Sequence, residues 1–382
     1  MVKLLTAQYG VENIVKSFGG AKGLSGVSLS VTGGEVHCIA GENGSGKSTL
    51  IKIMSGVHAP DSGVIQLGEK TFTHLSPREA VREGVQVIFQ DFSLLPNLTV
   101  AENIAMPTYI LNNSRILSKS QTKEIASNAL DLIGVDIDIN ASVADISIAS
   151  KQLIAIARAT NLGVKMLFMD EPTTGLDATV EAEVLDLVRE LRRETGTAVL
   201  FISHNLGVIR HMCDRVGVLY AGALVEQGAT EDIFSNPSHP YTVGLLRCIP
   251  RGGLHKNTDR LDTIPGTPPA LGTHFDGCVF ADRCALVEDK CRTTQPEMVT
   301  VGQSHVARCF HTDKAGSMPR AIDTVTVSVS QNPNRATTGT RLLDIDHLSK
   351  AFTQDGHAVH VVNDVSLQVG VGETLGLVGE SG

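Results

Sequence analysis

Over the first half of the chain, short apolar runs alternate with stretches in which apolar residues recur at helical spacing. The apolar runs have strand length and end in polar residues, and they lie at 36–40, 85–90, 164–169 and 197–202. Between them, positions such as Val180, Val184 and Leu187 fall on one helix face. Strands alternating with helices predict an α/β fold with a mainly parallel sheet that helices cover.

Two segments depart from this alternation. Residues 11–36 alternate apolar and polar positions in short runs broken by glycines, which predicts a small antiparallel sheet. Residues 91–160 show helical spacing instead, so we expect a mostly helical insertion whose apolar stripe is core packing. The stripe consists of Ile125, Ala126, Ala129, Leu130, Leu132 and Ile133.

The first apolar run leads into a glycine-rich loop that fits the pattern G-x-x-x-x-G-K-[ST], and an apolar helical segment follows. Glycines let such a loop curl so that backbone N–H groups face phosphate oxygens, and the helix adds the positive end of its dipole. We expect Lys47 to reach the β- and γ-phosphates and Ser48 to hold Mg²⁺. An ordinary turn is the weaker alternative, because strand and helix are both in place. The expected nucleotide-binding residues are Gly41, Asn43, Gly44, Ser45, Gly46, Lys47, Ser48 and Thr49.

Polar residues follow the other three apolar runs, where parallel strands meet at one edge of a sheet. Gln90 ends the second run, and Asp170 and Glu171 end the third. We expect Asp170 to hold the water shell of Mg²⁺ and Glu171 to orient the attacking water, rather than both being a solvated strand end. His204 follows the fourth run, so we favour a γ-phosphate contact over a structural role. Phe18 precedes the loop, and packing is its default interpretation.

Composition limits the class of protein. The 382 residues predict two or three domains at about 150 residues each. The sequence shows neither a secretory signal nor an apolar run near the roughly 20 residues that span a bilayer, so we expect a cytoplasmic protein that reaches the membrane through a partner. A net charge of −9 argues against nucleic acid as the main ligand.

Four of the seven cysteines follow the spacing C-x5-C-x6-C-x17-C, and they are Cys278, Cys284, Cys291 and Cys309. In a reducing compartment this spacing suggests metal ligands. The short C-x2-4-C knuckles of zinc sites are absent, which favours an iron–sulfur cluster. Zinc, with His305 as a further ligand, and free thiols are the alternatives. Burial is the default for Cys38, Cys213 and Cys248.

Taken together, residues 11–230 resemble the ATPases of ATP-binding cassette (ABC) transporters. The resemblance rests on the phosphate loop, Gln90, Met169-Asp170-Glu171-Pro172-Thr173, Gly175-Leu176-Asp177 and His204, in the family's order. It implies a P-loop NTPase core with an antiparallel β-subdomain and a helical subdomain. It also implies that Phe18 stacks on adenine, which reverses the packing interpretation. Gln90 would sense Mg²⁺ and the membrane subunits, Glu171 would be the catalytic base and His204 the switch histidine.

The family's signature Leu-Ser-Gly-Gly-Gln is degenerate in this chain. It reads Ile146-Ser147-Ile148-Ala149-Ser150, so that only Ser147 is kept. In the family two ATPase units sandwich ATP, and each signature closes the partner's phosphate loop. We therefore predict asymmetric sites, in which the site of Lys47 and Glu171 depends on a signature supplied in trans.

Beyond residue 235 the chain is similar to the C-terminal extension of oligopeptide and dipeptide importer ATPases. Its marks are Asn236-Pro237-Ser238-His239-Pro240-Tyr241-Thr242, Ile264-Pro265-Gly266 and the cysteine motif from Gly277 to Cys284. The resemblance implies a [4Fe–4S] cluster on the four cysteines.

An internal repeat follows a stretch rich in Ser, Thr and Asn. The run Val365-Ser366-Leu367, followed by Gly372-Glu373, repeats Val27-Ser28-Leu29, followed by Gly34-Glu35. In the same alignment, residues 379–382 correspond to residues 41–44. We expect a second cassette that begins here and stops inside its phosphate loop, as the front part of a fused two-cassette ATPase, with these last residues poorly ordered or loosely docked. The predicted domains are an ABC ATPase domain at 1–235 (helical subdomain about 91–160), the four-cysteine extension at 236–313, a linker at 314–340 and the truncated second cassette at 341–382.

These resemblances imply the ATPase subunit of an importer for oligopeptides, dipeptides or similar small solutes, peripheral at the cytoplasmic face of the membrane. The implied partners are integral membrane permease subunits, a second ABC ATPase domain and, indirectly, a solute-binding protein, with no nucleic acid. The implied cofactors are ATP and Mg²⁺. The alternatives are a sugar-type importer ATPase, an ABC ATPase outside transport and a nucleotide-binding remnant without turnover.

Overall fold

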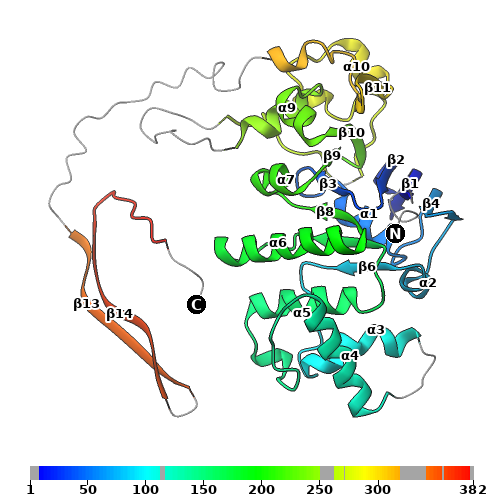
Figure 1. The fold of residues 1–382 in the computed structure, drawn as a ribbon. Helices are drawn as coiled ribbons and strands as arrows, with labels where there is room; N and C mark the ends of the chain where they lie inside the picture. The colour runs from blue at the N-terminus through cyan, green and yellow to red at the C-terminus, as the bar shows by residue number, and fades with distance from the viewer. Residues whose placement is uncertain are drawn as a thin grey trace. The chain divides into compact units, whose positions relative to one another are not determined.

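The computed structural model describes residues 8–111, 117–249, 262–270, 272–318, 341–354 and 357–378 (Figure 1). They fall into two compact units. The first holds nearly all described residues up to 318, and the second holds the C-terminal strands. The repeat residues 379–382 and most of the expected linker lie outside the described residues.

The first unit is built on an eight-stranded sheet with the order β11-β12-β10-β9-β3-β8-β7-β6. Five of its strands run parallel, as predicted, and they are β9 (Arg215–Tyr220), β3 (Val36–Ala40), β8 (Ala198–Ile202), β7 (Met166–Asp170) and β6 (Val85–Ile88). β3, β7 and β8 are buried along their whole length, which explains their unbroken apolar runs. The second predicted run is wrong at its end, because β6 stops at Ile88 and Gln90 lies in a turn.

Side chains from β3 enter two separate cores, one on each face of the sheet. Val36, Cys38 and Ala40 join the core with the longer helices, whereas Ile39 joins the core around the β-subdomain. Alternate residues of a strand point to opposite faces, so a helix layer on each side is needed to bury them. Among the helices that contact strands of the sheet are α1 (Lys47–Met54), α7 (Leu206–Met212) and α8 (Thr230–Ser235), and α6 (Ala178–Thr195) contributes Val184 and Val188 to the core with the longer helices.

The predicted antiparallel subdomain is a four-stranded sheet with the order β2-β1-β4-β5. Its strands are β1 (Gln8–Phe18), β2 (Ala21–Thr32), β4 (Ser62–Leu67) and β5 (Lys70–Phe72). The short helix α2 (Pro77–Arg82) follows it. Ser76 and Glu79 form a capping box at the start of α2, which satisfies two of its free backbone donors.

The predicted helical insertion is present between β6 and β7 (Figure 1). It consists of α3 (Val100–Leu111), α4 (Lys119–Leu132), the 3₁₀ turn η1 (Val143–Asp145) and α5 (Ile148–Thr160). Ala126, Ala129 and Leu130 are buried as expected, but the inclusion of Leu132 in the stripe is wrong, because its side chain is exposed.

The extension adds strands to the main sheet instead of forming a compact unit of its own. Strand β12 (His305–Ala307) pairs antiparallel with β10 (Ala223–Ala229), and β11 (Val299–Gly302) pairs with β12. Backbone hydrogen bonds thereby join the extension to the cassette. Its remaining elements are α9 (Pro240–Arg247), η2 (Ala281–Arg283), α10 (Asp289–Thr293) and η3 (Ala315–Ser317).

The second unit contains a two-stranded antiparallel sheet of β13 (Arg341–Gln354) and β14 (His357–Gly370). Its register shifts at four places along β13. The hairpin repeats details of β1 and β2. His347 and Asn13 both have positive φ, and each donates its backbone N–H to a serine of the paired strand, Ser366 and Ser28, over 2.9 Å.

Candidate functional site

The phosphate loop lies between β3 and α1, where the sequence predicted it. Gly41 and Gly46 are required for steric reasons, since a Cβ on Gly41 would collide with the carbonyl of Leu219 and one on Gly46 would lie 2.8 Å from that of Gly23. Both also have positive φ. No side chain caps the start of α1, so its first N–H groups remain available to an anion.

Lys47 is folded back onto the loop. Its Nζ donates to the carbonyls of Gly41 at 2.8 Å and Glu42 at 3.0 Å. Burial lowers the pKa of Lys47, and the nearby charges of Glu171 and Asp170 oppose that shift. The buried hydroxyl of Ser45 has no hydrogen-bond partner within the described part of the chain. A cation and an unpaired hydroxyl in one glycine-rich loop suit phosphate oxygens.

Asp170 and Ser48 meet at the edge of the loop. In the sheet, Ile202 of β8 pairs with Asp170 of β7 on one side and with Ile39 of β3 on the other. The three strands therefore end at the same level. Burial raises the pKa of Asp170, while a hydrogen bond from Ser48 lowers it. A carboxylate and a hydroxyl beside a phosphate loop are the hard oxygen ligands that Mg²⁺ takes, so the residues fit that ion.

Glu171 and His204 form a hydrogen-bonded pair next to the loop. The His204 Nδ1 lies 2.7 Å from the Glu171 Oε2, and the Thr174 hydroxyl donates to the same oxygen over 3.3 Å. Glu171 has a φ of 54°, a conformation that non-glycine residues rarely adopt. Such strain is often found at functional sites. A carboxylate held in this way can orient a water and accept its proton.

An open cavity separates the start of the phosphate loop from His204. It has a volume of about 420 Å³ and is lined by Gly41, Asn43, Ser203 and His204, among others. Leu245 of α9 contributes to the same wall, so that the extension already borders the site here.

Phe18 ends β1 with 44% of its surface exposed, which excludes the packing alternative. Its ring lies edge-on to His58, with 5.3 Å between the ring centroids. A Cβ on Gly23 would lie 3.2 Å from the ring, and the carbonyl of Gly23 approaches Gly46 of the phosphate loop. The Phe18 ring and the phosphate loop thus both lie next to Gly23.

Gln90 and Ser147 were also predicted to belong to this site. Among the hydrogen bonds and ion pairs of the described residues, none joins either of them to the cluster. Gln90 is exposed in the turn after β6. Ser147 is the N-cap of α5, where its hydroxyl accepts from the Ser150 N–H over 3.1 Å. Ile148 beside it is 53% exposed, so this helix start faces outward.

The four cysteines of the extension line one small pocket, together with His239, Phe280 and His311. Cys284 and Cys309 each accept a backbone N–H, from Leu286 and His311. Burial raises the pKa of Cys284 to about 11 and that of Cys309 to about 12, which favours neutral thiols.

Within the described ranges no group of three or more His, Cys, Asp or Glu side chains is arranged to hold a metal ion. His305, the further ligand considered for zinc, does not line this pocket, and its Nε2 lies 2.7 Å from Oε1 of the buried Glu226. Cys38 and Cys213 are buried as expected, whereas Cys248 is only partly buried.

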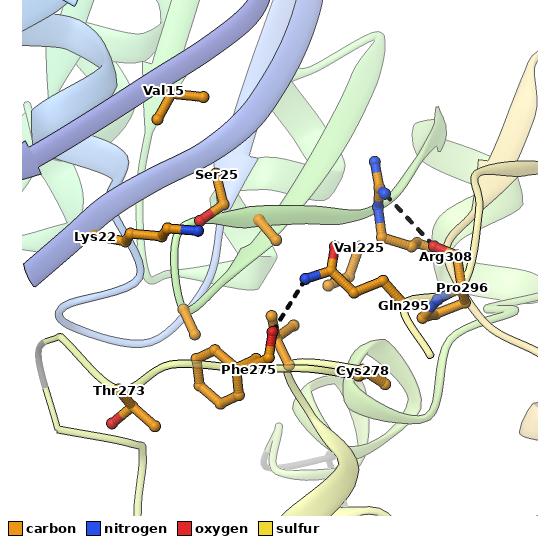
Figure 2. Close-up of a pocket in the computed structure, with 14 residues that line it drawn as sticks. Val15, Lys22, Ser25, Val225, Thr273, Phe275, Cys278, Gln295, Pro296 and Arg308 are labelled. Atoms are coloured by element: carbon orange, nitrogen blue, oxygen red, sulfur yellow. Dashed lines mark hydrogen bonds between the residues drawn. The ribbon is translucent and has the colours of Figure 1, made fainter. Parts of the chain in front are cut away.

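A second pocket, of about 210 Å³, lies between the β-subdomain and the extension (Figure 2). Val15 and Lys22 line one side, and Phe275 and Cys278 line another. Gln295 holds the loop of Phe275 by donating to its carbonyl over 3.2 Å. The extension thus packs on the cassette at several points.

Sequence reasoning missed the residues that connect the extension to the phosphate loop. Arg283 makes an ion pair with Glu42, with 2.7 Å between Nη1 and Oε2. Tyr241 accepts the backbone N–H of Glu42 over 2.8 Å. Arg283 and Tyr241 belong to motifs noted in the sequence, but nothing in their spacing indicates that they contact Glu42, which lies 241 and 199 positions away.

Comparison with known proteins places this site in a family. Residues 24–174 match the family model of the ABC transporter, and residues 225–291 match that of the oligopeptide/dipeptide transporter, C-terminal region. The chain belongs to the ATP-binding proteins of ABC transporters of the oligopeptide and dipeptide importer type. No helix in the described residues is long and apolar enough to cross a membrane.

Individual relatives agree with this assignment. The chain is 35% identical over 376 residues to the oligopeptide transport ATP-binding protein OppD of Mycobacterium bovis and of Mycobacterium tuberculosis. The alignment covers 94% of this chain but only 61% of those proteins. A putative peptide import ATP-binding protein of Brucella melitensis biotype 1 is 36% identical over 307 residues, covering 74% of this chain and 90% of that protein.

Solved structures share the cassette fold. The ADP conformation of MJ1267, an ATP-binding cassette of an ABC transporter, is 30% identical with a TM-score of 0.56. It covers 63% of this chain and 98% of that structure. The dimeric structure of MJ0796, a bacterial ABC transporter cassette, is 26% identical with a TM-score of 0.53, over 58% of this chain and 98% of that one.

Proposed function

We propose that this chain binds and hydrolyses ATP to power the ABC-type import of oligopeptides, dipeptides or similar small solutes. The observation that carries the proposal is the Glu171–His204 pair next to a phosphate loop that contains Lys47, the Ser45 hydroxyl without a described partner and the uncapped start of α1. The match to the peptide-transporter C-terminal region supports the solute class.

The residues divide the work as follows. Lys47 and the loop N–H groups bind the β- and γ-phosphates, and Phe18 stacks on the base. Ser48 and Asp170 hold Mg²⁺, which neutralises charge on the phosphates when it is bound. Glu171 orients a water for in-line attack and accepts its proton.

His204 fixes the orientation of the Glu171 carboxylate and contacts the γ-phosphate. Gln90, exposed in the turn after β6, couples the site to the membrane subunits and to Mg²⁺.

The two nucleotide sites of the working assembly are unequal. The cassette MJ0796 is described as dimeric, and an equivalent pairing of this chain with a second ABC ATPase domain would put an α5 start against the opposite phosphate loop. This chain offers Ser147 without the two glycines of the signature. Its own Lys47 and Glu171 therefore need a signature from the partner, while its degenerate signature weakens the partner's site.

The helical insertion is the surface we assign to the permease subunits, which place the chain at the cytoplasmic face of the membrane. Among the large apolar side chains of this segment that are exposed are Leu95, Ile110 and Leu132. A solute-binding protein would take part indirectly.

The C-terminal hairpin belongs to a second cassette in this proposal. Beyond the serine contacts shared with β1 and β2, Glu373 accepts the N–H of Gly370 over 2.7 Å just as Glu35 accepts that of Thr32 over 2.8 Å. Equivalent contacts at equivalent repeat positions support a repeated structural unit. Sequencing the gene past the codon for Gly382 tests this, since a continuing frame should supply Gly-Lys-Ser/Thr.

For the four cysteines we propose an iron–sulfur cluster, with zinc as the alternative. Their shared pocket and the backbone N–H groups donated to Cys284 and Cys309 support it, although the described side chains are not arranged to hold a metal ion. Anaerobic purification should yield visible absorption with bound iron and sulfide, all lost in Cys284→Ser. A colourless protein with bound zinc would favour the alternative.

Glu171→Gln tests the catalytic proposal. It should reduce ATP turnover by about 10²–10⁴-fold, the usual contribution of a general base, while ATP still binds. The matched control is Glu183→Gln, which changes an exposed carboxylate on α6 and should leave turnover unaltered. Undiminished turnover in Glu171→Gln would remove the assigned role. ATP binding without any turnover in the wild type, even with permease and partner cassette present, would favour a remnant.

A further inference from the structure

Glu42, the second residue of the phosphate loop, is held from outside the cassette. Arg283 of η2 reaches its carboxylate with both terminal nitrogens, at 2.7 Å from Oε2 and 3.3 Å from Oε1. Tyr241 of α9 accepts its backbone N–H over 2.8 Å. Both residues belong to the extension, so one residue of the nucleotide site carries contacts from two separate elements beyond it.

Arg283 is held in position by contacts other than that with Glu42. Its guanidinium also donates to the carbonyls of Pro265 at 2.8 Å and Ile264 at 3.3 Å, and its side chain is only 6% exposed. It lies over the ring of Tyr220 at 5.8 Å. A planar guanidinium with several fixed partners positions a carboxylate more strictly than an ammonium can.

Tyr241 is equally constrained, because its ring is fully buried. It packs against Tyr220 with 4.6 Å between centroids and against Phe280 with 5.4 Å. The hydroxyl is therefore presented to Glu42 by a rigid aromatic cluster, and α9 begins one residue before it, at Pro240.

Glu42 is the anchor of the loop. Its carbonyl accepts from the Lys47 Nζ at 3.0 Å and from the Ser45 N–H at 3.2 Å. When Lys47 turns to a phosphate, the contacts to Arg283 and Tyr241 remain and keep the start of the loop in place. We propose that Arg283 and Tyr241 position the phosphate loop through Glu42, so that the extension controls nucleotide affinity.

The same cluster touches the cysteine pocket. Phe280, which packs on Tyr241, lines that pocket, and Arg283 directly precedes Cys284 in the chain. A change in the four cysteines would shift Phe280 or Cys284 and thereby the two contacts to Glu42. The chain has a short physical path from the cysteines to the nucleotide.

The test is a double-mutant cycle on the full chain, with ATP as the probe and both affinity and turnover measured. The inference rests on the proposed ATP binding. Arg283→Gln and Glu42→Gln should each raise Kd and KM for ATP about tenfold, within the usual range of coupling between sites, with kcat changed much less because Glu171 and His204 are untouched. The double variant should be no weaker than either single one. Arg283→Lys, which keeps the charge but not the fork, should recover part of the affinity.

Arg292→Gln is the matched control, because this arginine of α10 pairs with Asp282 at the surface of the same extension. It should leave ATP affinity unchanged. If Arg283→Gln does not fold, Tyr241→Phe provides the test, because it keeps the ring and removes only the acceptor for the Glu42 N–H. We expect it to raise Kd by about two- to twelvefold, the usual net effect of losing one such hydrogen bond.

The outcomes separate the two proposals. Absence of ATP binding in the wild type would overturn the proposed function itself. Wild-type affinity in Arg283→Gln and Tyr241→Phe, or additive losses in the double variant, would overturn this inference and leave the proposed function standing. A fall in kcat alone would also overturn it, because a residue that positions the loop acts on binding.

Discussion

Glu226 joins three segments of the chain, and replacing it measures how firmly the extension is anchored. Its carboxylate lies on β10 and is fully buried. One oxygen accepts from the N–H of Ser238 at 2.6 Å and lies 2.7 Å from the Nε2 of His305, and the other accepts from the N–H of His239 at 3.0 Å. Ser238 and His239 lead into α9, and His305 begins β12.

The magnitude follows from the donors that lose their acceptor. Glu226→Ala leaves two backbone N–H groups and an imidazole without their acceptor in the core, and three such losses at about 1–3 kcal/mol each lower the free energy of unfolding by at least about 3 kcal/mol. At about 2–4 °C per kcal/mol for a chain of this size, Tm should fall by at least ~6 °C. Glu226→Gln keeps the shape and one oxygen, and the imidazole can change tautomer, so one backbone donor is lost at about 1–3 kcal/mol.

Chemical denaturation and differential scanning calorimetry of the full chain at neutral pH measure both quantities. The control is Glu231→Gln, an exposed carboxylate on α8, whose effect should stay within about 0.5 kcal/mol. A Glu226→Ala variant within 1 kcal/mol of the wild type would refute the reasoning, by the usual measure of such losses. Equal losses for Ala and Gln would show that unpaired donors are not the source of the cost.

Three further predictions concern pH, the base and the metal. Burial lowers the pKa of His239 to about 4, so between pH 6.5 and 4 the unfolded chain binds a proton that the folded chain does not. The free energy of unfolding should be at its full value above pH 6.5 and fall by up to ~3 kcal/mol toward pH 4. His239→Asn retains a capping acceptor, so denaturation of this variant should lose ~3 kcal/mol less than the wild type over the same pH range. Phe18→Ala should weaken ATP binding by about 5–150-fold in titration calorimetry, the range of one base–aromatic stack, whereas Phe18→Trp should bind as the wild type does; equal affinity for all three would place the base elsewhere. Ser48→Ala should raise the Mg²⁺ concentration needed for half-maximal turnover and leave metal-free ATP binding intact, and an unchanged Mg²⁺ requirement would contradict the assignment of this hydroxyl.

The sequence by itself determined the elements and the position of the nucleotide site. β3, β7 and β8 are buried on both faces, so their runs are apolar throughout and can be found without a partner. The phosphate loop needs only the strand before it and the helix after it. Asp170, Glu171 and His204 come together because parallel strands end at a common edge, a consequence of topology that the alternation of strands and helices already contains.

The sequence predicted the ends of strands and the buried faces of helices less accurately than the elements themselves. The second run continued apolar through Phe89, although β6 ends at Ile88. Leu132 had the spacing of the buried stripe on α4, yet it lies outside. Spacing indicates which residues share a face, but the neighbouring helices decide which positions at its margin are covered.

Only the tertiary structure decided how the extension meets the cassette. The contacts of Glu42 with Arg283, and of Glu226 with His305, join residues far apart in the chain whose local patterns carry no sign of one another. The strand β12 joins β10 through backbone hydrogen bonds, which any sequence can form. A local pattern reports the faces that a segment buries, whereas a buried ion pair depends on which two surfaces meet, and that is settled only when the whole chain has folded.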